Sequence, residues 1–265
     1  MRLTAKVLAP WIGLSIGNSR LHWFYYQGSQ LDRTWDTPHV GTPIDQAPAR
    51  WAEWQQHSPA FADHPVSHPL PALWIVSVVS SQTLFWQTYP QAKVLSHADI
   101  PLQQPYPTFG LDRALALWAA GTLYQWPVLV IDAGTAMTYT GATSPAHCVG
   151  GAILPGLGLQ LRSLNQATSD LPAVALPPQL PKRWALETPS AIQSGILHTL
   201  IAGMTDFIQA WLDEYPTSKI VITGGDAAML HRYLAGQPAT APLMEGLILD
   251  PLLPGRGLQR LRQLE

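Results

Sequence analysis

Apolar and polar positions along the chain follow two periods, and each period predicts one kind of element. Short apolar runs bounded by Gly, Asn or Pro are typical of buried strands; they occur at WIGLSIG, LHWFYYQG, ALWIVSVVS, VLVIDAGTAMTYTGA, HCVGGAILPG and KIVIT. The first two runs are separated only by the tight turn Asn18-Ser19-Arg20, and VLVIDAGTAMTYTGA contains two strand-like runs around Gly134. The pattern therefore predicts a β-hairpin near the start of the chain and another near its middle.

Helical spacing appears between these runs. A helix is predicted from about Asp112 to Tyr124, and others at PARWAEWQQH, LGLQLRSLNQAT and the AAMLHRYL that follows KIVITGGD. The longest helix is predicted from Pro189 to about Glu214, with Thr188 as its N-cap and Pro189 in its first turn. Strands that alternate with helices after an initial hairpin predict an α/β protein.

The chain also contains an internal echo. LSIGNSRLHW and VIDAGTAMTY both read as an apolar strand, a small polar or acidic residue, a glycine turn and a second strand. Ser15 and Asp132 occupy the same slot, about half the chain apart. Two related halves explain this spacing, and we expect an N-terminal domain at residues 1–120 and a C-terminal domain at residues 121–265.

Composition narrows the function classes. Charged residues make up 12% of the 265 residues and the formal net charge is −2. This balance gives no indication that the protein binds nucleic acid or an acidic membrane surface. The single cysteine, Cys148, excludes an internal disulfide and suits a cytoplasmic protein. Pro10 interrupts the apolar N-terminal stretch, which we interpret as the approach to the first strand and not as a signal peptide. No apolar run is long enough to cross a membrane.

Four short motifs could carry chemistry. Two of them are the glycine turns of the internal echo, in SIGNS and DAGT. A glycine turn with neighbouring hydroxyls can hold phosphate oxygens, and an acid one step earlier can hold a cation. The competing interpretation is a tight turn without a ligand, which favours the same residue types. TGGDAAML places two glycines at a helix start, where a nucleotide could lie against the backbone. GLDR places Asp112 beside Arg113 at another helix start, as a base and an anion clamp or as ordinary capping residues.

The ordered series SIGNS, GLDRALALWAA, DAGTAMT, GGAILPGLGLQLRSLNQATSDLP, TPSAIQSGI and TGGDA resembles the type III pantothenate kinases. That family belongs to the superfamily of acetate and sugar kinases, heat-shock ATPases and actin. The resemblance extends from about residue 11 to the C-terminal PLMEGLIL. It implies two ribonuclease-H-like, actin-like ATPase domains with the nucleotide in the cleft between them, a homodimer, and ATP-dependent phosphorylation of pantothenate at the start of coenzyme A synthesis.

The resemblance also implies roles for individual residues. Asp112 looks like the general base, and Asp132 matches the acid that binds an activating monovalent cation, K⁺ or NH₄⁺. The implied ATP-binding residues are Ser15, Ile16, Gly17, Asn18, Ser19, Arg20, Leu21, His22, Thr135, Gly224 and Gly225, with Mg²⁺ accompanying ATP. The implied pantothenate-binding residues are Tyr106, Gly110, Leu111, Asp112, Arg113 and Thr188.

Two positions depart from the family pattern. The first phosphate motif of the family usually begins with an acid, and that position is Ser15 in this chain. A tyrosine usually stands seven residues before the glycine of GLDR; Gln103 takes that place, and Tyr106 is the nearest replacement. Two other functions are therefore weighed beside the kinase: a non-catalytic nucleotide-binding regulator of the same fold, and a phosphotransferase that acts on another small hydroxyl substrate.

Overall fold

The computed structural model describes residues 9–41, 51, 53, 58, 61–63 and 69–265, so the helix predicted at PARWAEWQQH lies largely outside the described residues. By compactness the chain divides into two units. Unit 1 comprises residues 1–101, 108–115 and 254–265, and unit 2 comprises residues 102–107 and 116–253. The expected domains at residues 1–120 and 121–265 stay a prediction.

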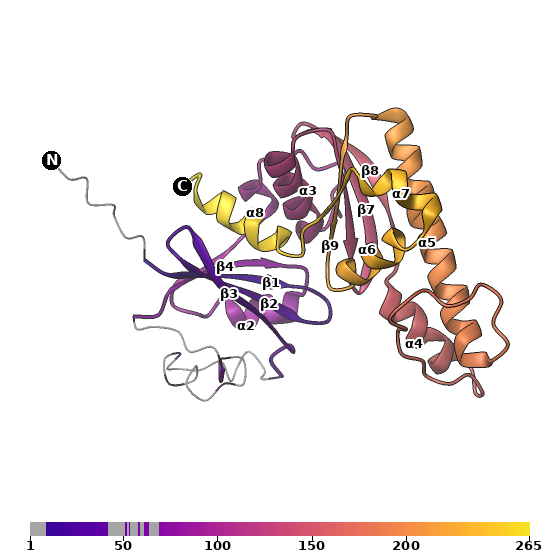
Figure 1. Cartoon of the computed structure of the whole chain (residues 1–265). Coiled ribbons are helices and arrows are strands. Elements are labelled where there is room, and N and C mark those ends of the chain that lie inside the picture. Colours follow the sequence, from indigo (N-terminus) through magenta and orange to yellow (C-terminus); the bar gives the residue numbers. More distant parts are fainter. Residues whose placement is uncertain (1–8, 42–50, 52, 54–57, 59–60, 64–68) are drawn as a thin grey trace. The chain divides into compact units, whose positions relative to one another are not determined.

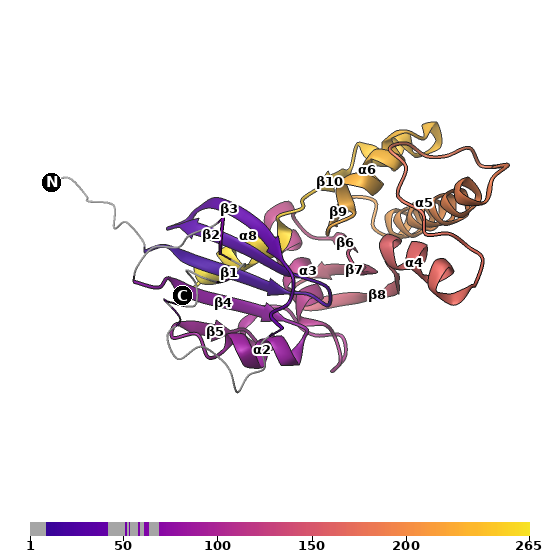
Figure 2. The same ribbon diagram turned by 90° about the horizontal axis from the view of Figure 1, so that it is seen from below.

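Unit 1 contains a five-stranded sheet (Figures 1 and 2). Its strands are β1 (Trp11–Ile16), β2 (Leu21–Gln27), β3 (Gln30–Thr37), β4 (Ala72–Ser77) and β5 (Ala92–Val94). Its helical elements are α2 (Ser80–Trp86), η2 (His97–Asp99), the start of α3 (Leu111–Tyr124) and nearly all of α8 (Leu253–Arg262). The predicted hairpin is confirmed as β1 and β2, whereas the strand predicted at ALWIVSVVS is too long, because it ends at Ser77 and α2 begins at Ser80.

Unit 2 contains the second five-stranded sheet. Its strands are β6 (Val128–Ala133), β7 (Ala136–Ser144), β8 (His147–Pro155), β9 (Lys219–Thr223) and β10 (Leu247–Leu249). Its helical elements are the rest of α3, α4 (Leu157–Ala167), α5 (Thr188–Glu214), α6 (Ala227–Ala235), η3 (Pro238–Thr240) and α7 (Ala241–Met244). The predicted α/β class is confirmed. No helix within the described parts of the chain is both long and apolar enough to cross a membrane.

The two sheets have the same topology. Unit 1 has the strand order β3-β2-β1-β4-β5, and unit 2 read from its β8 edge has the order β8-β7-β6-β9-β10. In each sheet the central strand pairs antiparallel with the strand that follows it and parallel with the later one. Ser15 and Asp132 occupy the same place in these sheets, which confirms that the two motifs are internal equivalents.

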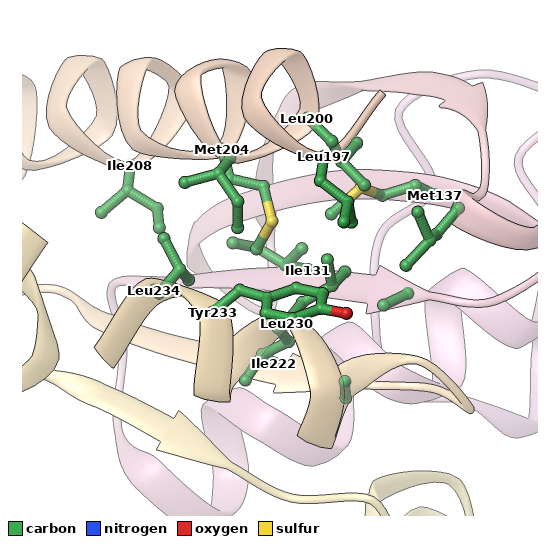
Figure 3. Packing of buried hydrophobic residues seen from close by; sticks show 14 of the residues in the cluster. Ile131, Met137, Leu197, Leu200, Met204, Ile208, Ile222, Leu230, Tyr233 and Leu234 are labelled. Atoms are coloured by element: carbon green, nitrogen blue, oxygen red, sulfur yellow. The ribbon is translucent and has the colours of Figure 1, made fainter. Parts of the chain in front are cut away.

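The core of unit 2 lies on one face of its sheet. Alternate residues of β6 and β9, such as Ile131 and Ile222, point to this face and meet side chains of α5 and α6 (Figure 3). Met204 in α5 is fully buried there, and burial of such a side chain contributes about 1.5–3 kcal/mol. The other face of the same strands is left to Val130, Asp132 and Thr223, so strand alternation determines which side the acid faces.

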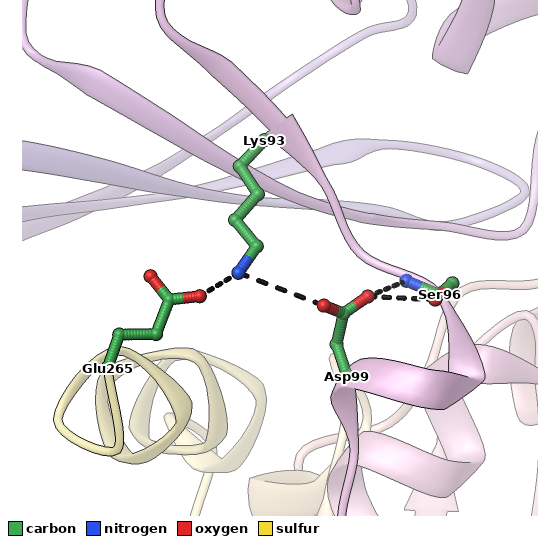
Figure 4. A network of polar contacts seen from close by, with 4 residues as sticks. All are labelled: Lys93, Ser96, Asp99 and Glu265. Carbon is green, nitrogen blue, oxygen red and sulfur yellow. Dashed lines mark hydrogen bonds and ion pairs between the residues drawn. The ribbon is translucent and has the colours of Figure 1, made fainter.

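Helix α8 belongs to unit 1 because it packs closely on the first sheet. A Cβ on Gly13 would lie 2.8 Å from Leu258 Cδ1, and one on Gly255 would lie 2.3 Å from Phe24 Cδ1. The guanidinium of Arg262 lies 4.7 Å from the centre of the Trp11 ring. Figure 4 shows the end of the chain beyond α8, where Lys93 of β5 contacts Glu265 and lies 3.7 Å from Asp99 Oδ1.

Candidate functional site

The turn of the first hairpin is exposed. The backbone N–H of Gly17 donates to the carbonyl of Arg20 at 3.1 Å, and Asn18, Ser19 and Arg20 are exposed. Ile16 and Leu21, which flank the turn, are buried in the core, and the carbonyl of Ile16 accepts from the backbone N–H of Val78 at 3.1 Å, so both ends of the turn are anchored in the sheet. Ser15 is also buried, at 8% exposure.

The pairing of β2 with β3 places Asp36 beside the first phosphate motif. Ser15 is the register partner of His22 on β2, and His22 is the register partner of Asp36 on β3. His22 Nδ1 lies 2.7 Å from Asp36 Oδ1, and this hydrogen bond is the main reason that the pKa of Asp36 is lowered, although partial burial opposes it. Sequence reasoning missed Asp36, because the mostly exposed strand β3 was not predicted.

His39 also contacts the turn. Its Nε2 donates to the carbonyl of Gly17 at 2.8 Å, so the loop that follows β3 fixes the glycine of the first motif. The sequence gives no local signal for this contact, because the two residues are brought together only by the β1–β2–β3 pairing.

The GLDR motif forms the start of α3, as predicted. The backbone N–H of Arg113 donates to Asp112 Oδ1 at 2.7 Å, and a Cβ on Gly110 would lie 2.6 Å from that oxygen. Burial raises the pKa of the Asp112 carboxyl, while the Arg113 hydrogen bond and positive charge act in the opposite direction. Glycine thus lets the carboxylate fold back over the helix start, where burial makes ionisation less favourable than it is in water.

The other two substrate-motif residues of GLDR are buried. Leu111 is 8% exposed, and Arg113 is equally buried with its guanidinium 4.9 Å from the centre of the Phe109 ring. A guanidinium is a planar cation whose N–H groups can pair with the two oxygens of a carboxylate. Arg113 therefore has the chemistry of an anion clamp.

The second phosphate motif lies at the end of β6 in unit 2. Asp132 is half-buried and is the register partner of Thr138 on β7 and of Thr223 on β9. Thr135, in the turn that follows, is exposed. The Oγ1 of Thr223 is buried without a hydrogen-bond partner in the described part of the chain. The three register partners Asp132, Thr138 and Thr223 supply one carboxylate and two hydroxyls on one face of the sheet.

Gly224 brings the TGGD turn against this motif. It has φ +94°, and a Cβ on it would lie 2.5 Å from Asp132 Oδ1 and 2.7 Å from the Ala133 carbonyl oxygen. The backbone N–H of Asp226 donates to that carbonyl at 2.9 Å. The structure therefore joins two predicted motifs that are far apart in sequence, whereas Gly225 is exposed with open space around its Cα.

Asp226 links this turn to α4. Burial raises the pKa of its carboxyl, and the backbone N–H of Gly158 together with the positive charge of Arg162 opposes that rise. At the start of α4, the N–H of Gly156 donates to the Thr135 carbonyl at 2.9 Å. Three stretches, 132–135, 156–162 and 224–226, therefore meet at the C-terminal ends of the neighbouring strands β6 and β9.

Tyr106 and Thr188 are the remaining predicted substrate residues. Tyr106 is 39% exposed in the segment that precedes α3. Thr188 is exposed and is the first residue of α5, so the predicted N-cap role is wrong: Glu187 takes that position, and Pro189 lies in the first turn as predicted. Ser194 of α5 donates to the carbonyl of Arg183 at 2.7 Å, which ties the preceding Pro-rich segment to the helix.

The end of β6 carries oxygen donors that could hold a cation. Among the described residues no group of three or more His, Cys, Asp or Glu side chains could hold a metal ion. Asp132 and the unpartnered Thr223 hydroxyl offer one charged and one neutral oxygen donor. Carboxylate and hydroxyl oxygens are hard donors of the kind that bind hard cations, and Mg²⁺ commonly binds through substrate phosphates as well.

Similar proteins of known structure share the fold. A protein from Campylobacter jejuni described as a Baf family transcriptional activator aligns with a TM-score of 0.59 and 19% identity, over 96% of this chain and 98% of its own. A protein from Sinorhizobium meliloti described as a 2-dehydro-3-deoxygalactonokinase aligns with a TM-score of 0.54 and 13% identity, over 96% of each chain. These likenesses concern the fold alone.

Sequence comparison goes further. The Nostoc sp. protein named type III pantothenate kinase is 46% identical over 259 residues, which covers 94% of this chain and 93% of its own. The family model described as type III pantothenate kinase matches residues 11–210. The chain therefore belongs to the type III pantothenate kinase family.

Proposed function

We propose that this protein transfers the γ-phosphoryl group of ATP to the terminal hydroxyl of pantothenate, giving 4′-phosphopantothenate and ADP. The observation that carries the proposal is that the chain belongs to the type III pantothenate kinase family. The Asp112 carboxyl, which the resemblance implies to be the general base, supports it, because burial raises its pKa. A carboxylate with a raised pKa accepts a proton more readily than an ordinary aspartate.

In this reaction Asp112 takes the proton of the substrate hydroxyl as the oxygen attacks the γ-phosphorus and the bond to the β–γ bridging oxygen breaks. Most of the rate enhancement in phosphoryl transfer comes from positioning and from neutralisation of charge. Arg113, fixed over Phe109, is suited to the pantothenate carboxylate. Gly110, Leu111, Tyr106 and Thr188 complete the proposed substrate contacts.

The phosphates of ATP are proposed to contact the first hairpin turn and Thr135, and Gly224 and Gly225 to approach the nucleoside. The exposed residues Asn18, Ser19 and Arg20 of this turn support the first contact, since backbone N–H groups of such turns can bind phosphate oxygens. Mg²⁺ would be held by the ATP phosphates, because Ser15 supplies no charge at the start of this motif.

A monovalent cation, K⁺ or NH₄⁺, is proposed to bind at Asp132. The carboxylate and the nearby Thr223 hydroxyl support this assignment. When bound, such a cation supplies positive charge beside the phosphate motif. Asp132→Asn should remove the activation by K⁺ while leaving the residual rate in Na⁺ nearly unchanged.

A homodimer is also proposed. Ile153 and Val149 on β8, which lies at an edge of the sheet of unit 2, are 63% and 43% exposed. Apolar side chains exposed along an edge strand are typical of an interface. Sedimentation of the purified chain at micromolar concentration tests this proposal, and a monomer would contradict it.

Mass spectrometry of a reaction with ATP, Mg²⁺ and pantothenate tests the activity, with K⁺ in one sample and Na⁺ in a matched one. We expect 4′-phosphopantothenate in both and more of it with K⁺. Because Ser15 is neutral, the competing function is a nucleotide-binding regulator. A folded protein that binds ATP without forming this product would favour the regulator, and product from another hydroxyl substrate would favour a related phosphotransferase.

A further inference from the structure

The hairpin of unit 1 continues into a hydrogen-bonded pair, His22 and Asp36, of which Asp36 lies outside the phosphate motif. Ser15, His22 and Asp36 are successive register partners across β1, β2 and β3, so their side chains project from the same face of the sheet. His22 is the middle member of this row. It lies directly beside the position at which the family usually carries an acid.

The His22 ring is held in a defined orientation. Its Nδ1 donates to Asp36 Oδ1 at 2.7 Å, and the opposite ring nitrogen, Nε2, consequently points away from Asp36. Both side chains are only partly exposed, at 40% for His22 and 46% for Asp36. His39 fixes the adjacent turn through the Gly17 carbonyl. The pair and the turn are therefore arranged before any ligand arrives.

Arg20 and His22 are the side chains near this turn that could bind a negatively charged polyphosphate. The positive charge of Arg20 acts on Asp36, which makes it the other nearby cation of the turn. An imidazole that donates from both nitrogens, here to a carboxylate on one side and to a phosphate oxygen on the other, is an imidazolium. Ser15, being neutral, does not compete for it.

We propose that His22 donates its Nε2–H to a phosphate oxygen of ATP and that Asp36 is the positioning residue that holds the ring for this contact. The inference rests on the proposed kinase function, because it assigns the ATP phosphates to this turn. It adds Asp36 to the residues on which nucleotide binding depends, and it gives His22 a defined donor atom.

Two simpler explanations make different predictions. A surface ion pair that only stabilises the hairpin contributes little to stability and nothing to nucleotide affinity. If Asp36 acted on ATP only through its charge, its removal would relieve repulsion and tighten binding. A positioning role predicts the opposite sign, since loss of the carboxylate releases the ring and weakens the phosphate contact.

The test is a double-mutant cycle in the full chain, with the dissociation constant of a non-hydrolysable ATP analogue measured by calorimetry in the presence of Mg²⁺. The variants are His22→Ala, Asp36→Asn and the double variant. Asp32→Asn is the matched control, because Asp32 is another partly exposed acid of β3 with its own partner, Arg33, at 3.8 Å. KM for ATP and kcat are measured on the same proteins, and melting temperatures confirm that each is folded.

We expect His22→Ala to weaken analogue binding about tenfold, a typical loss for one charge-assisted hydrogen bond. Asp36→Asn should weaken it about threefold to tenfold, with the effect on KM for ATP larger than that on kcat. It should have no further effect once His22 is absent. Asp32→Asn should bind as the parent does, and Asp36→Glu should recover part of the loss.

Unchanged or tighter binding by Asp36→Asn would overturn the inference, as would an equal loss in the presence and absence of His22. If Asp36→Asn does not fold, Asp36→Glu and His22→Ala carry the test, and parent-like binding by His22→Ala overturns the inference. A parent protein that binds the analogue but phosphorylates no pantothenate refutes the proposed function while the cycle still reads out this contact. A parent that does not bind the analogue refutes both.

Discussion

The replacement of Gly224 by alanine tests how the second phosphate motif is built. Gly224 has φ +94°, a conformation that costs an L-residue about 1–2 kcal/mol. The new Cβ would also lie 2.6 Å from Ala133 C and 2.5 Å from Asp132 Oδ1. Overpacking of this kind costs about 1–3 kcal/mol. Since one of the close neighbours is backbone, the strand end must shift, and we expect a total loss of about 2–5 kcal/mol.

The matched control is Gly225→Ala, one position along the same turn. Gly225 does not have a left-handed backbone, and nothing lies within 4 Å of the position that its Cβ would take. Alanine there reduces the freedom of the unfolded chain and should leave stability unchanged or raise it by about 0.4–1 kcal/mol. The two variants therefore separate the demand on the backbone from the general effect of adding a methyl group.

Urea denaturation and thermal melting of both variants provide the measurement. For a protein of this size about 1 kcal/mol corresponds to roughly 2–4 °C in Tm, so Gly224→Ala should melt about 5–15 °C below the parent. It should also lose dependence on K⁺, because the Asp132 carboxylate is displaced. A Gly224→Ala protein as stable as Gly225→Ala would refute the claim that this close approach fixes the strand end.

Three further results are expected. Asp112→Asn should lower kcat about 10²- to 10⁴-fold. It should also raise Tm at pH 7, because the folded-state pKa of Asp112 is raised and its ionised form therefore costs stability at neutral pH. Melting curves across pH should show this gain vanish below the ordinary aspartate pKa. For the same reason the acid limb of kcat/KM should lie above the ordinary aspartate value of 3.8, and a limb at or below 3.8 in a pH–rate profile would contradict a buried base. Arg113→Gln should raise KM for pantothenate about tenfold or more with KM for ATP unchanged, and equal changes in both constants in initial-rate kinetics would contradict its role as an anion clamp.

The sequence predicts those elements whose pattern is strong. Continuous apolar runs such as 128–131 and 220–222 became central strands, and the steady helical period after Pro189 became α5. Strand β3 was missed because only one of its eight residues is buried and its pattern is polar. Strands β5 and β10 have three residues each and no detectable period. Periodicity therefore fails where a strand buries little apolar surface.

The candidate site was predictable motif by motif but not as a set of contacts. GLDR and DAGT lie on the elements expected for them, because glycine and an acid at an element end are local signals. The approach of Gly224 to Asp132 depends on the parallel pairing of β6 with β9, and the His22–Asp36 bond depends on the unpredicted β3. Such long-range pairings are set by packing of the whole sheet, which no local pattern encodes.

The most direct test of the central claim is transfer of labelled γ-phosphate from ATP to pantothenate by the purified chain, measured beside the Asp112→Asn variant. The account predicts labelled 4′-phosphopantothenate from the parent and at least a hundredfold less from the variant, with both proteins folded and both binding ATP. Equal transfer by the two proteins would remove Asp112 from the reaction. No transfer by the folded parent would contradict the assignment of pantothenate kinase activity to this chain.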